Sequence, residues 1–346
     1  MAGASFPVLP TIRPRILALH FSQPSTLSSS VSKHRIFKRH FINKIKLSPL
    51  SLSMETPLRV SASSTIGAAD EGLEVGSSGL VGEHDLLIVG PGVLGRLVAE
   101  KWREEHPCCQ IYGQTMTMDH HEELIKLGIN PSLRETQRTQ KVPYVIFCAP
   151  PSRTLDYPDD VRMAALNWNG EGSFLFTSSA AVYDRNDNGE CDEDGPIVPL
   201  GRSPRTDVIL KAEEVVVESG GCVLRLVGLY KADRGAHNYY LEKGTVDGRP
   251  DYILNLIHYE DAASLAVAVL KKKLRSHIFL GCDNHPLSRQ EMMELVNKSG
   301  KFSKKFEGFT GTDGPLGKKL NNFKTRQEIG WEPKYPSFAH CLAVTD

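Results

Sequence analysis

The chain alternates between two patterns of apolar and polar residues from Asp85 onward. Apolar runs of strand length occur at positions 85–90, 110–115, 144–150, 173–179, 222–230 and 277–283. Segments with the spacing of amphipathic helices lie at positions 93–107, 120–128, 159–168, from 204 onward, and 288–300. Strands that alternate with helices in this way predict a parallel sheet whose strands are joined by crossover helices.

Local signals define several of these helices more closely. Leu94, Val98 and Trp102 fall on one face of the segment 93–107, so we expect them to be buried. Gly128 is placed to end the helix before it, and the pair Ser203-Pro204 provides an N-cap and a first helical residue.

The pattern predicts an α/β fold with a Rossmann-type, doubly wound parallel sheet and a smaller C-terminal α/β lobe. We expect the Rossmann domain to span residues 85–230 and the lobe, which would bind substrate, to span residues 231–346. Residues 253–273 show a strand followed by a long helix, and part of 253–283 is expected to return to the sheet.

The N-terminal segment differs from the rest of the chain in charge. Residues 1–54 contain eight Lys or Arg and no Asp or Glu, and they are rich in serine and proline. This composition predicts a transit peptide over residues 1–60, with the chloroplast as the first destination and the mitochondrion as the second. A disordered basic tail is the remaining alternative, and residues 61–84, rich in Ser, Gly and Ala, are expected to be a disordered linker.

Charge and composition also exclude several classes of partner. Residues 55–346 contain 33 basic and 41 acidic side chains, so no general basic field favours nucleic acid. No segment reaches the apolar length of a membrane span, so we expect a soluble protein with a small-molecule substrate. The seven cysteines form no CxxC pair, which predicts neither a metal site nor a disulfide framework. The oligomeric state stays open.

A glycine-rich segment, GPGVLG at positions 90–95, follows the first strand and opens the first helix. Its glycines, Gly90, Gly92 and Gly95, have the G-x-G-x-x-G spacing of a dinucleotide-binding turn. Such a turn lets the backbone approach a pyrophosphate at the helix N-terminus. We therefore expect these glycines, with Val93 and Leu94 between them, to bind the cofactor.

The sequence leaves the type of dinucleotide open between NADP and NAD. An NAD site usually has an acidic residue about 20 residues after the glycines, but the segment 112–117 contains none. Arg96, in the first turn of the helix, could reach a 2′-phosphate or could be an ordinary surface residue. We expect NADP ahead of NAD, because no carboxylate would repel its phosphate.

Further motifs follow the glycine segment in the order seen in a known superfamily. They are CAPPS at 148–152, TSSAAVY at 177–183, RLVGLYKADR at 225–234, NLIHYEDAA at 255–263 and NNFKTRQEIGWEPKYPSF at 321–338. With these motifs, residues 85–340 resemble the extended short-chain dehydrogenase/reductase superfamily, in its NAD-dependent epimerase/dehydratase-like branch. The resemblance, to an atypical member of plant plastid type, implies that Cys148, Ala149 and Pro150 lie at the cofactor.

The resemblance also implies a catalytic set of a Ser or Thr, a Tyr and a Lys, which this chain keeps only in part. Ser179 matches the hydroxyl position, but Arg205 falls on the tyrosine and Ile209 on the lysine. Lys211 would lie about 200° around the helix from residue 209, where we expect it to be solvated and paired with Asp207. The Tyr-x-x-x-Lys dyad is therefore missing.

These observations leave two classes of function. The first is a plastid oxidoreductase or epimerase-like enzyme that binds NAD(P) and acts on a small sugar-nucleotide-like or carbonyl-bearing metabolite. Its candidate catalytic residues are Ser179, Tyr183 and Arg205, followed by Tyr230 and His258. The second is a non-catalytic nucleotide-sensing or assembly protein. An enzyme should gather Ser179, Tyr183 and Arg205 at the nicotinamide, whereas a scaffold should fill that space with apolar side chains.

Overall fold

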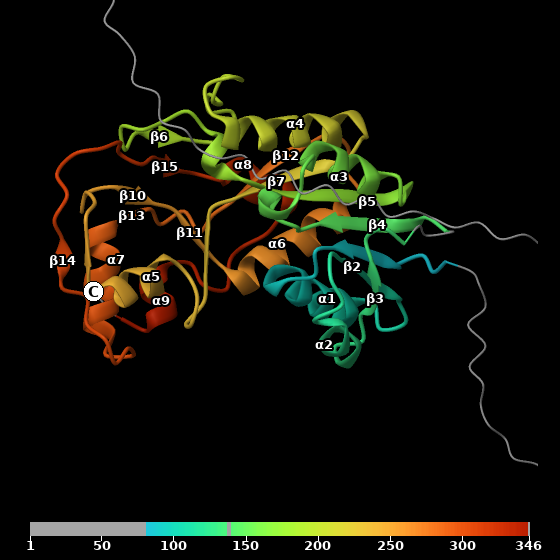
Figure 1. Cartoon of the computed structure of the whole chain (residues 1–346), viewed down its shortest axis with the longest axis horizontal. Helices are drawn as coiled ribbons and strands as arrows, with labels where there is room; N and C mark the ends of the chain where they lie inside the picture. Colours follow the sequence, from blue (N-terminus) through green and yellow to red (C-terminus); the bar gives the residue numbers. More distant parts are fainter. Residues whose placement is uncertain (1–80, 137–139, 345–346) are drawn as a thin grey trace, which may run out of the picture. The chain divides into compact units, whose positions relative to one another are not determined.

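A seven-stranded parallel sheet forms the centre of the folded body (Figure 1). The computed structural model describes residues 81–136 and 140–344, so the predicted leader lies outside the described residues, as does the linker up to residue 80. The sheet consists of β1 (Leu86–Val89), β2 (Ile111–Thr115), β3 (Asn130–Leu133), β4 (Val142–Phe147), β5 (Trp168–Ser179), β7 (Cys222–Leu226) and β12 (Ile278–Gly281).

The strand order is β12-β7-β5-β4-β1-β2-β3, and every neighbouring pair is parallel. Strand β1 lies between β2 and β4, so the direction of winding reverses at β1 and β4. Ligands of doubly wound sheets bind beyond the carboxyl ends of the strands at this reversal. The predicted Rossmann-type α/β fold is confirmed, and its order places the glycine segment beside the reversal.

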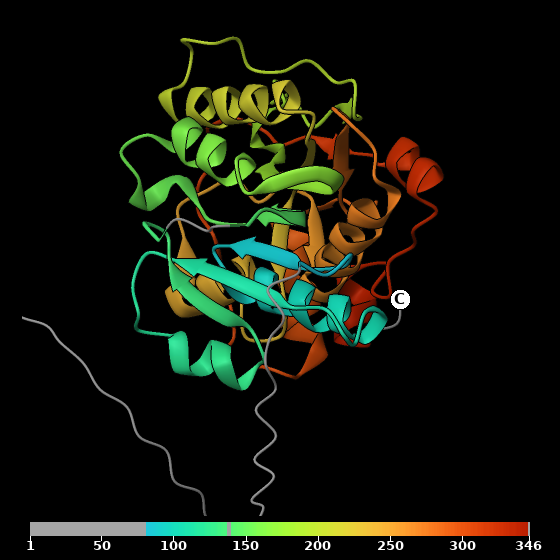
Figure 2. The same ribbon diagram turned by 90° about the vertical axis from the view of Figure 1, so that its right-hand side faces the viewer.

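Helices cover both faces of this sheet, as Figure 2 shows. Side chains alternate along β1, with Leu86 and Ile88 on one face and Leu87 and Val89 on the other. The first face is covered by α1 (Val93–Glu105) and α6 (Tyr259–Lys272), with α2 (His121–Lys126) beside them; the second face is covered by α3 (Tyr157–Ala165) and α4 (Pro204–Glu218).

The local helix signals behave as the sequence predicts. Leu94, Val98 and Trp102 are buried on α1, and the Trp102 indole donates a hydrogen bond to the carbonyl of His84 at 2.8 Å. The Ser203 side chain accepts from the backbone N–H of Thr206 and so caps α4. Because His84 and its neighbour Val81 contact the core, the last residues of the predicted linker pack against the domain.

Beyond the sheet, the chain forms a lobe around a separate apolar core that includes Met292, Met293 and Phe338. Its helices are α5 (Ala236–Lys243), α7 (Arg289–Ser299) and α9 (Phe338–Leu342), whereas α8 (Phe323–Ile329) packs against α6 and β12 of the main body. Short strand pairs link the lobe's loops: β6 (Glu190–Cys191) with β15 (Lys319–Leu320), β8 (Gly228–Tyr230) with β11 (Leu256–His258), β9 (Thr245–Val246) with β14 (Gly308–Phe309), and β10 (Ile253–Leu254) with β13 (Leu287–Ser288). The later segment α6–β12 belongs to the main body, because β12 pairs with β7 and α6 packs against α1.

Some elements differ from those expected. The run 222–230, predicted as one strand, divides at Val227: β7 stays in the main sheet, whereas β8 leaves it to pair with β11. Strand β3 and helix α5 were not predicted at all. Strand β3 contains Pro131, which a strand tolerates at the edge of a sheet. In the part of the chain that the structure describes, no helix is both long enough and apolar enough to cross a membrane.

Candidate functional site

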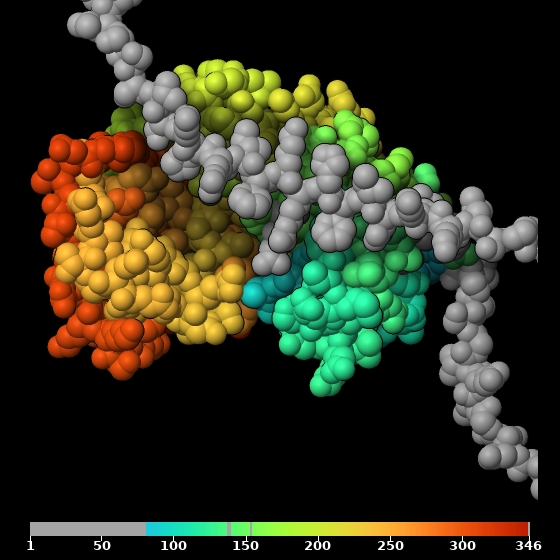
Figure 3. Space-filling view, in the orientation of Figure 1, coloured from blue at the N-terminus to red at the C-terminus, as the bar shows by residue number. Residues whose placement is uncertain are grey.

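A cleft of about 470 Å³ opens beyond the carboxyl ends of β1, β4, β5 and β7. The glycine segment and the residues after β4 line one part of it, and the end of β5 lines another. The segment after β8 and the first residue of α6 also reach the cleft. In the space-filling view the surface is hollowed between the lobe, in gold to red, and the glycine-segment side of the sheet, in cyan to green (Figure 3).

Each glycine of the segment meets a different spatial requirement. Gly90 has φ +79°, and a Cβ atom there would lie 2.7 Å from the Cα of Ala149. A Cβ on Gly95 would lie 2.9 Å from the Cγ2 of Ile88, so this glycine allows α1 to pack closely on β1. A Cβ on Gly92 would meet no atom nearer than 4.0 Å, and Gly92 therefore faces open space in the cleft.

The N-terminus of α1 suits an anion. Gly92 is its N-cap, no side-chain hydrogen bond caps this end, and its first turn contains no acidic residue. The backbone N–H groups of Val93, Leu94 and Gly95 start the helix beside the cleft, where helix N-terminal amides and the helix dipole favour a phosphate. The residues present therefore fit the pyrophosphate of a dinucleotide.

The segment that follows β4 forms the adjoining wall. Cys148, Ala149 and Pro150 all line the cleft, and the Tyr157 hydroxyl holds this segment by donating to the Ala149 carbonyl at 2.7 Å. Burial raises the pKa of the Cys148 thiol to about 12, so the thiol stays protonated at neutral pH. A protonated thiol is a poor nucleophile, so Cys148 contributes surface rather than chemistry.

Serine and threonine side chains at the end of β5 provide the polar edge of the cleft. Ser179 lines it, and its Oγ accepts from the backbone N–H of Ala181 at 3.2 Å. Thr177 donates to the Phe147 carbonyl at 3.1 Å, which ties β5 to β4. Since Ser179 uses its oxygen as an acceptor, its hydroxyl proton is left to donate into the cleft.

A buried ion pair lies behind this edge. The Ser178 hydroxyl donates to Glu213 Oε1 at 2.5 Å, and Arg225 donates to both oxygens of the same carboxylate, at 3.1 and 2.7 Å. The side chains of Glu213 and Arg225 are each 5% exposed. Bidentate contacts of this kind fix both groups, and this one joins α4 to β7. Sequence reasoning missed it, although Glu213 lies on the same stripe of α4 as residues 205 and 209.

Tyr183 and Arg205, the other two predicted catalytic residues, are not brought to the cleft. Tyr183 is 1% exposed, its hydroxyl donates to the Glu193 carbonyl at 3.3 Å, and its ring lies under the Arg225 guanidinium. Burial raises the pKa of the Tyr183 phenol to about 12. Arg205 is exposed in the first turn of α4 and is not among the residues that line the cleft. Of the three candidates, only Ser179 reaches it.

The position of the missing lysine is apolar. Ile209 lines the cleft, so the side of α4 that faces it carries no ammonium group. Lys211 is exposed, as expected, but the expected pair with Asp207 is wrong. The Asp207 carboxylate instead accepts from the backbone N–H of Gly201, at 3.0 and 3.1 Å, which closes the turn before α4.

The remaining candidates have structural contacts. The Tyr230 ring packs against Phe338, and its hydroxyl donates to the Ser337 carbonyl at 3.5 Å. His258 caps α6 by accepting from the backbone N–H of Glu260 at 3.3 Å, and burial lowers its pKa. Neither residue is among those that line the cleft.

Arg96 points away from the cleft. Its Nε donates to the Pro91 carbonyl at 3.3 Å, and its guanidinium forms an ion pair with Glu123 at 2.9 Å. A second cavity of about 830 Å³ lies at the carboxyl ends of β1, β2 and β3, and Gln114 and Arg134 are among its lining residues. Arg134 is paired with Asp160 in its wall.

Two residues that sequence reasoning did not select, Arg234 and Tyr259, line the cleft. Arg234 Nε donates to the Tyr259 hydroxyl at 3.1 Å. Both stand inside the motifs RLVGLYKADR and NLIHYEDAA, which was the available signal. Among the described residues that line the cleft, Arg234 is the only cation and no carboxylate is present. Across positions 81–136 and 140–344, no three His, Cys, Asp or Glu side chains group as metal ligands.

No model of a known protein family matches this chain, and no curated protein is significantly similar to it in sequence. Solved structures do match. A functionally unknown conserved protein from Silicibacter pomeroyi DSS is 20% identical, with a TM-score of 0.62 over 75% of this chain and 96% of that chain.

Two enzymes show the same likeness at lower identity. dTDP-glucose 4,6-dehydratase from Bacillus anthracis str. Ames, in complex with NAD, is 15% identical, with a TM-score of 0.61 over 75% of this chain and 94% of its own. UDP-glucuronic acid 4-epimerase from Bacillus cereus, in complex with UDP-glucuronic acid and NAD, is 15% identical, with a TM-score of 0.60 over 75% of this chain and 97% of its own. The chain therefore has the fold of these sugar-nucleotide dehydratase and epimerase structures.

Proposed function

We propose that the protein binds NAD(P) in the cleft, with the pyrophosphate at the N-terminus of α1. The uncapped first turn of α1 carries this proposal, together with the open space beside Gly92. Gly92 and Val93 to Gly95 would hold the phosphates, while Cys148, Ala149 and Pro150 would contact the neighbouring part of the cofactor. The nearby cavity that contains Gln114 would receive the adenosine end.

We expect NADP to be bound ahead of NAD. The residues that end β2, from Gln114 to Thr117, contain no carboxylate that would repel a 2′-phosphate or accept from a 2′-hydroxyl. Arg96 and Arg134 are the nearby cations, and each would have to exchange a carboxylate partner for the phosphate. NAD is the alternative, and it is the cofactor of the similar solved enzymes.

The enzyme that these residues favour is an oxidoreductase or epimerase-like enzyme that acts on a small metabolite. Bound NAD(P) would supply hydride transfer. Ser179 would donate a hydrogen bond to a substrate oxygen and orient it, since its proton is free on the cleft side. One similar enzyme was solved with UDP-glucuronic acid, so a sugar nucleotide is the first substrate class to test, with small carbonyl compounds as the second.

A non-catalytic nucleotide-sensing or assembly protein is the second candidate. Ile209, Leu226, Val227 and Leu229 give the cleft an apolar wall, and Tyr183 and Arg205 do not converge there. Without a phenol and an ammonium group in these positions, a bound cofactor would be held with little acid–base assistance. Tight cofactor binding without oxidation or reduction of any tested substrate would favour this candidate.

One experiment tests cofactor binding directly. The full chain is titrated with NAD, NADH, NADP and NADPH, and its melting temperature is followed. We expect NADP and NADPH, or NAD and NADH, to raise the melting temperature. A ligand at 100 times its dissociation constant stabilises the folded state by about 2.7 kcal/mol. NADP or NADPH should act at a lower concentration than NAD or NADH. No shift with any of the four would refute the proposal.

We also propose that residues 1–60 direct the protein to chloroplasts, with mitochondria as the alternative. The composition of residues 1–54, basic and without acidic side chains, supports this. A fluorescent reporter fused after residue 60 should enter plastids in plant cells. Fluorescence confined to the cytosol would contradict the proposal, and fluorescence in mitochondria would favour the alternative.

A further inference from the structure

The paired side chains of Arg234 and Tyr259 provide hydrogen-bond donors inside the cleft that no described residue uses. Arg234 has five N–H donors, and among the described residues only its Nε has an acceptor, the Tyr259 hydroxyl at 3.1 Å. The phenol oxygen is the acceptor in this contact, so its own O–H remains free to donate. Within positions 81–136 and 140–344, no carboxylate forms an ion pair with Arg234.

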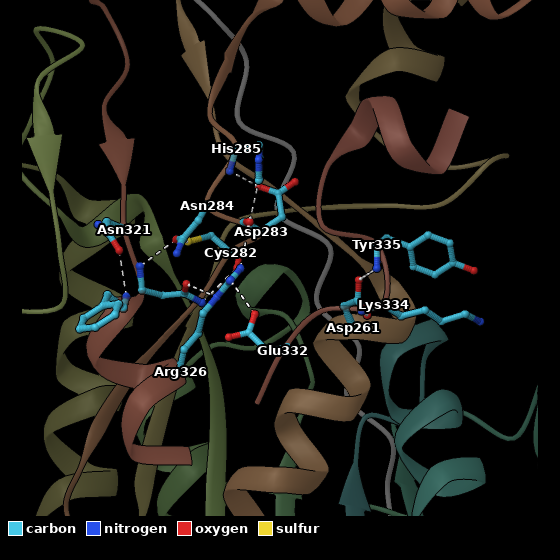
Figure 4. Close-up of polar contacts among 12 residues, drawn as sticks. Asp261, Cys282, Asp283, Asn284, His285, Asn321, Arg326, Glu332, Lys334 and Tyr335 are labelled. Carbon is cyan, nitrogen blue, oxygen red and sulfur yellow. Dashed lines mark hydrogen bonds and ion pairs between the residues drawn. The ribbon is translucent and has the colours of Figure 1, made fainter. Parts of the chain in front are cut away.

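The nearest acidic residues in sequence are already engaged. Asp233 is paired with Lys231 at 3.0 Å, and Glu260 is paired with Lys334 at 2.9 Å. Figure 4 shows Asp261 beside the loop that contains Lys334 and Tyr335, and its carboxylate accepts from the backbone N–H of both, at 2.8 and 2.9 Å. None of these carboxylates forms an ion pair with Arg234, which is the only charged residue among the described residues that line the cleft.

The backbone around each residue is held in place, and the exposed Arg234 side chain is attached to Tyr259 through its Nε. Residues 231–234 form a tight turn in which Lys231 and Arg234 exchange N–H to carbonyl bonds, at 2.8 and 3.0 Å. Gly235 follows with φ +142°, and a Cβ there would lie 2.9 Å from the Cβ of Tyr230. Tyr259 is 8% exposed, at the start of α6. An exposed guanidinium that lines the cleft and keeps free donors is suited to binding an anion.

We propose that Arg234 and Tyr259 form a binding site for phosphate oxygens, separate from the N-terminus of α1. This inference deepens the proposed function and rests on it in one respect, that the cleft receives a phosphorylated ligand. Arg234 would contribute its terminal N–H groups to two phosphate oxygens, and Tyr259 would donate its O–H to one of them. The phosphate could belong to the cofactor's pyrophosphate or to a phosphorylated substrate.

Two calorimetric titrations of the full chain separate these sources. In the first, ADP-ribose is added to the protein without cofactor, because it carries the pyrophosphate and lacks the nicotinamide. In the second, inorganic pyrophosphate is added to the protein in the presence of excess NADP⁺. The variants are Arg234→Gln and Tyr259→Phe, and Arg162→Gln serves as the control, since Arg162 is exposed on α3 with its partner Asp159.

We expect Arg234→Gln to weaken binding at least about tenfold in one titration, because hydrogen bonds to charged groups are among the stronger ones. Tyr259→Phe should weaken binding in the same titration by a smaller factor, and Arg162→Gln should leave the affinity in both titrations unchanged. If Arg234→Gln binds ADP-ribose more weakly than the wild type does, the site belongs to the cofactor. If it binds inorganic pyrophosphate more weakly, the site belongs to the substrate. Both outcomes support the inference.

The results also distinguish this inference from the proposed function. If the wild-type chain binds ADP-ribose and Arg234→Gln matches Arg162→Gln in both titrations, the inference is overturned and the cofactor proposal stands. If the wild-type chain does not bind ADP-ribose but binds pyrophosphate through Arg234, the anion site stands and the cofactor proposal fails. Equal melting temperatures of the variants verify that each is folded.

Discussion

Asp283 is a buried carboxyl group whose protonation should make the stability of the fold depend on pH. It follows β12, is 1% exposed, and its Oδ1 accepts from the backbone N–H of His285 at 2.9 Å. Its Oδ2 is buried without a hydrogen-bond partner among the described residues. Figure 4 shows the nearby Arg326, which donates to the Asp283 backbone carbonyl at 3.0 Å and forms an ion pair with Glu332 at 2.8 Å. Burial raises the pKa of Asp283 to about 8.

The sign of the effect follows from which state holds the proton. The ordinary pKa of an aspartate side chain is 3.8, so between pH 4 and pH 8 the folded chain keeps a proton on Asp283 that the unfolded chain has lost. Stability therefore falls as the pH rises through this window, by at most about 1.4 kcal/mol per pH unit. Between pH 6 and pH 8 the loss amounts to at most about 3 kcal/mol, and water reaching the carboxylate would reduce it.

The variant Asp283→Asn removes this titration while keeping the size of the side chain. At pH 5 its stability should stay within about 1–2 kcal/mol of that of the wild type, because in both proteins a neutral group places an unpaired donor at the Oδ2 position. Its free energy of unfolding should then change less between pH 6 and pH 8 than that of the wild type. Urea unfolding at pH 5, 6, 7 and 8 measures both quantities.

The exposed Asp313 provides the control, because Asp313→Asn should leave the wild-type pH dependence unchanged. Comparing differences between pH values removes the contributions of histidines and other groups that all three proteins share. If Asp283→Asn loses stability between pH 6 and pH 8 as steeply as the wild type, then Asp283 is ionised in the folded protein and the reasoning is wrong.

Three further predictions concern the cleft. Gly92→Asp should abolish the thermal shift with NAD(P), because its carboxylate would repel the pyrophosphate. The fold should stay intact, since φ at Gly92 is −76° and a Cβ there meets no close atom. An unchanged thermal shift would count against the site at the N-terminus of α1. Glu213→Gln should destabilise the protein by about 3–5 kcal/mol in urea unfolding, because the Arg225 charge would lose its buried partner. Glu214 is exposed and next in sequence, so an equal loss of stability in Glu214→Gln would show that the ion pair is not the cause. Once a substrate is found, Ser179→Ala should lower turnover at least about tenfold, because the substrate would no longer be oriented by the Ser179 hydroxyl. Lys211→Ala should leave turnover nearly unchanged, and NAD(P)H absorbance measures both. A large loss of turnover in Lys211→Ala at a normal melting temperature would contradict the helix register.

The sequence by itself determined six of the seven strands of the main sheet, the helices that cover it and the glycine segment. These features depend on short-range patterns: apolar spacing along one strand or helix, a capping residue such as Ser203, and glycines at fixed separation. Each of these patterns is contained in a short stretch of sequence, so it can be recognised without knowing the tertiary structure. The sequence also placed an apolar residue, Ile209, at the lysine position of the motif, through the alignment with the superfamily that the chain resembles.

Only the tertiary structure decided which polar side chains meet in the cleft. Ser179 and Tyr183 are four residues apart, yet the short 3₁₀ turn Ala180–Val182 keeps one at the cleft and turns the other into the core. Arg234 and Tyr259 come together because β8 pairs with β11, a contact that no local pattern specifies. The burial of Asp283 likewise depends on chain segments far apart in sequence. Local periodicity determines which face of an element is buried, whereas packing between distant segments decides which residues form a site.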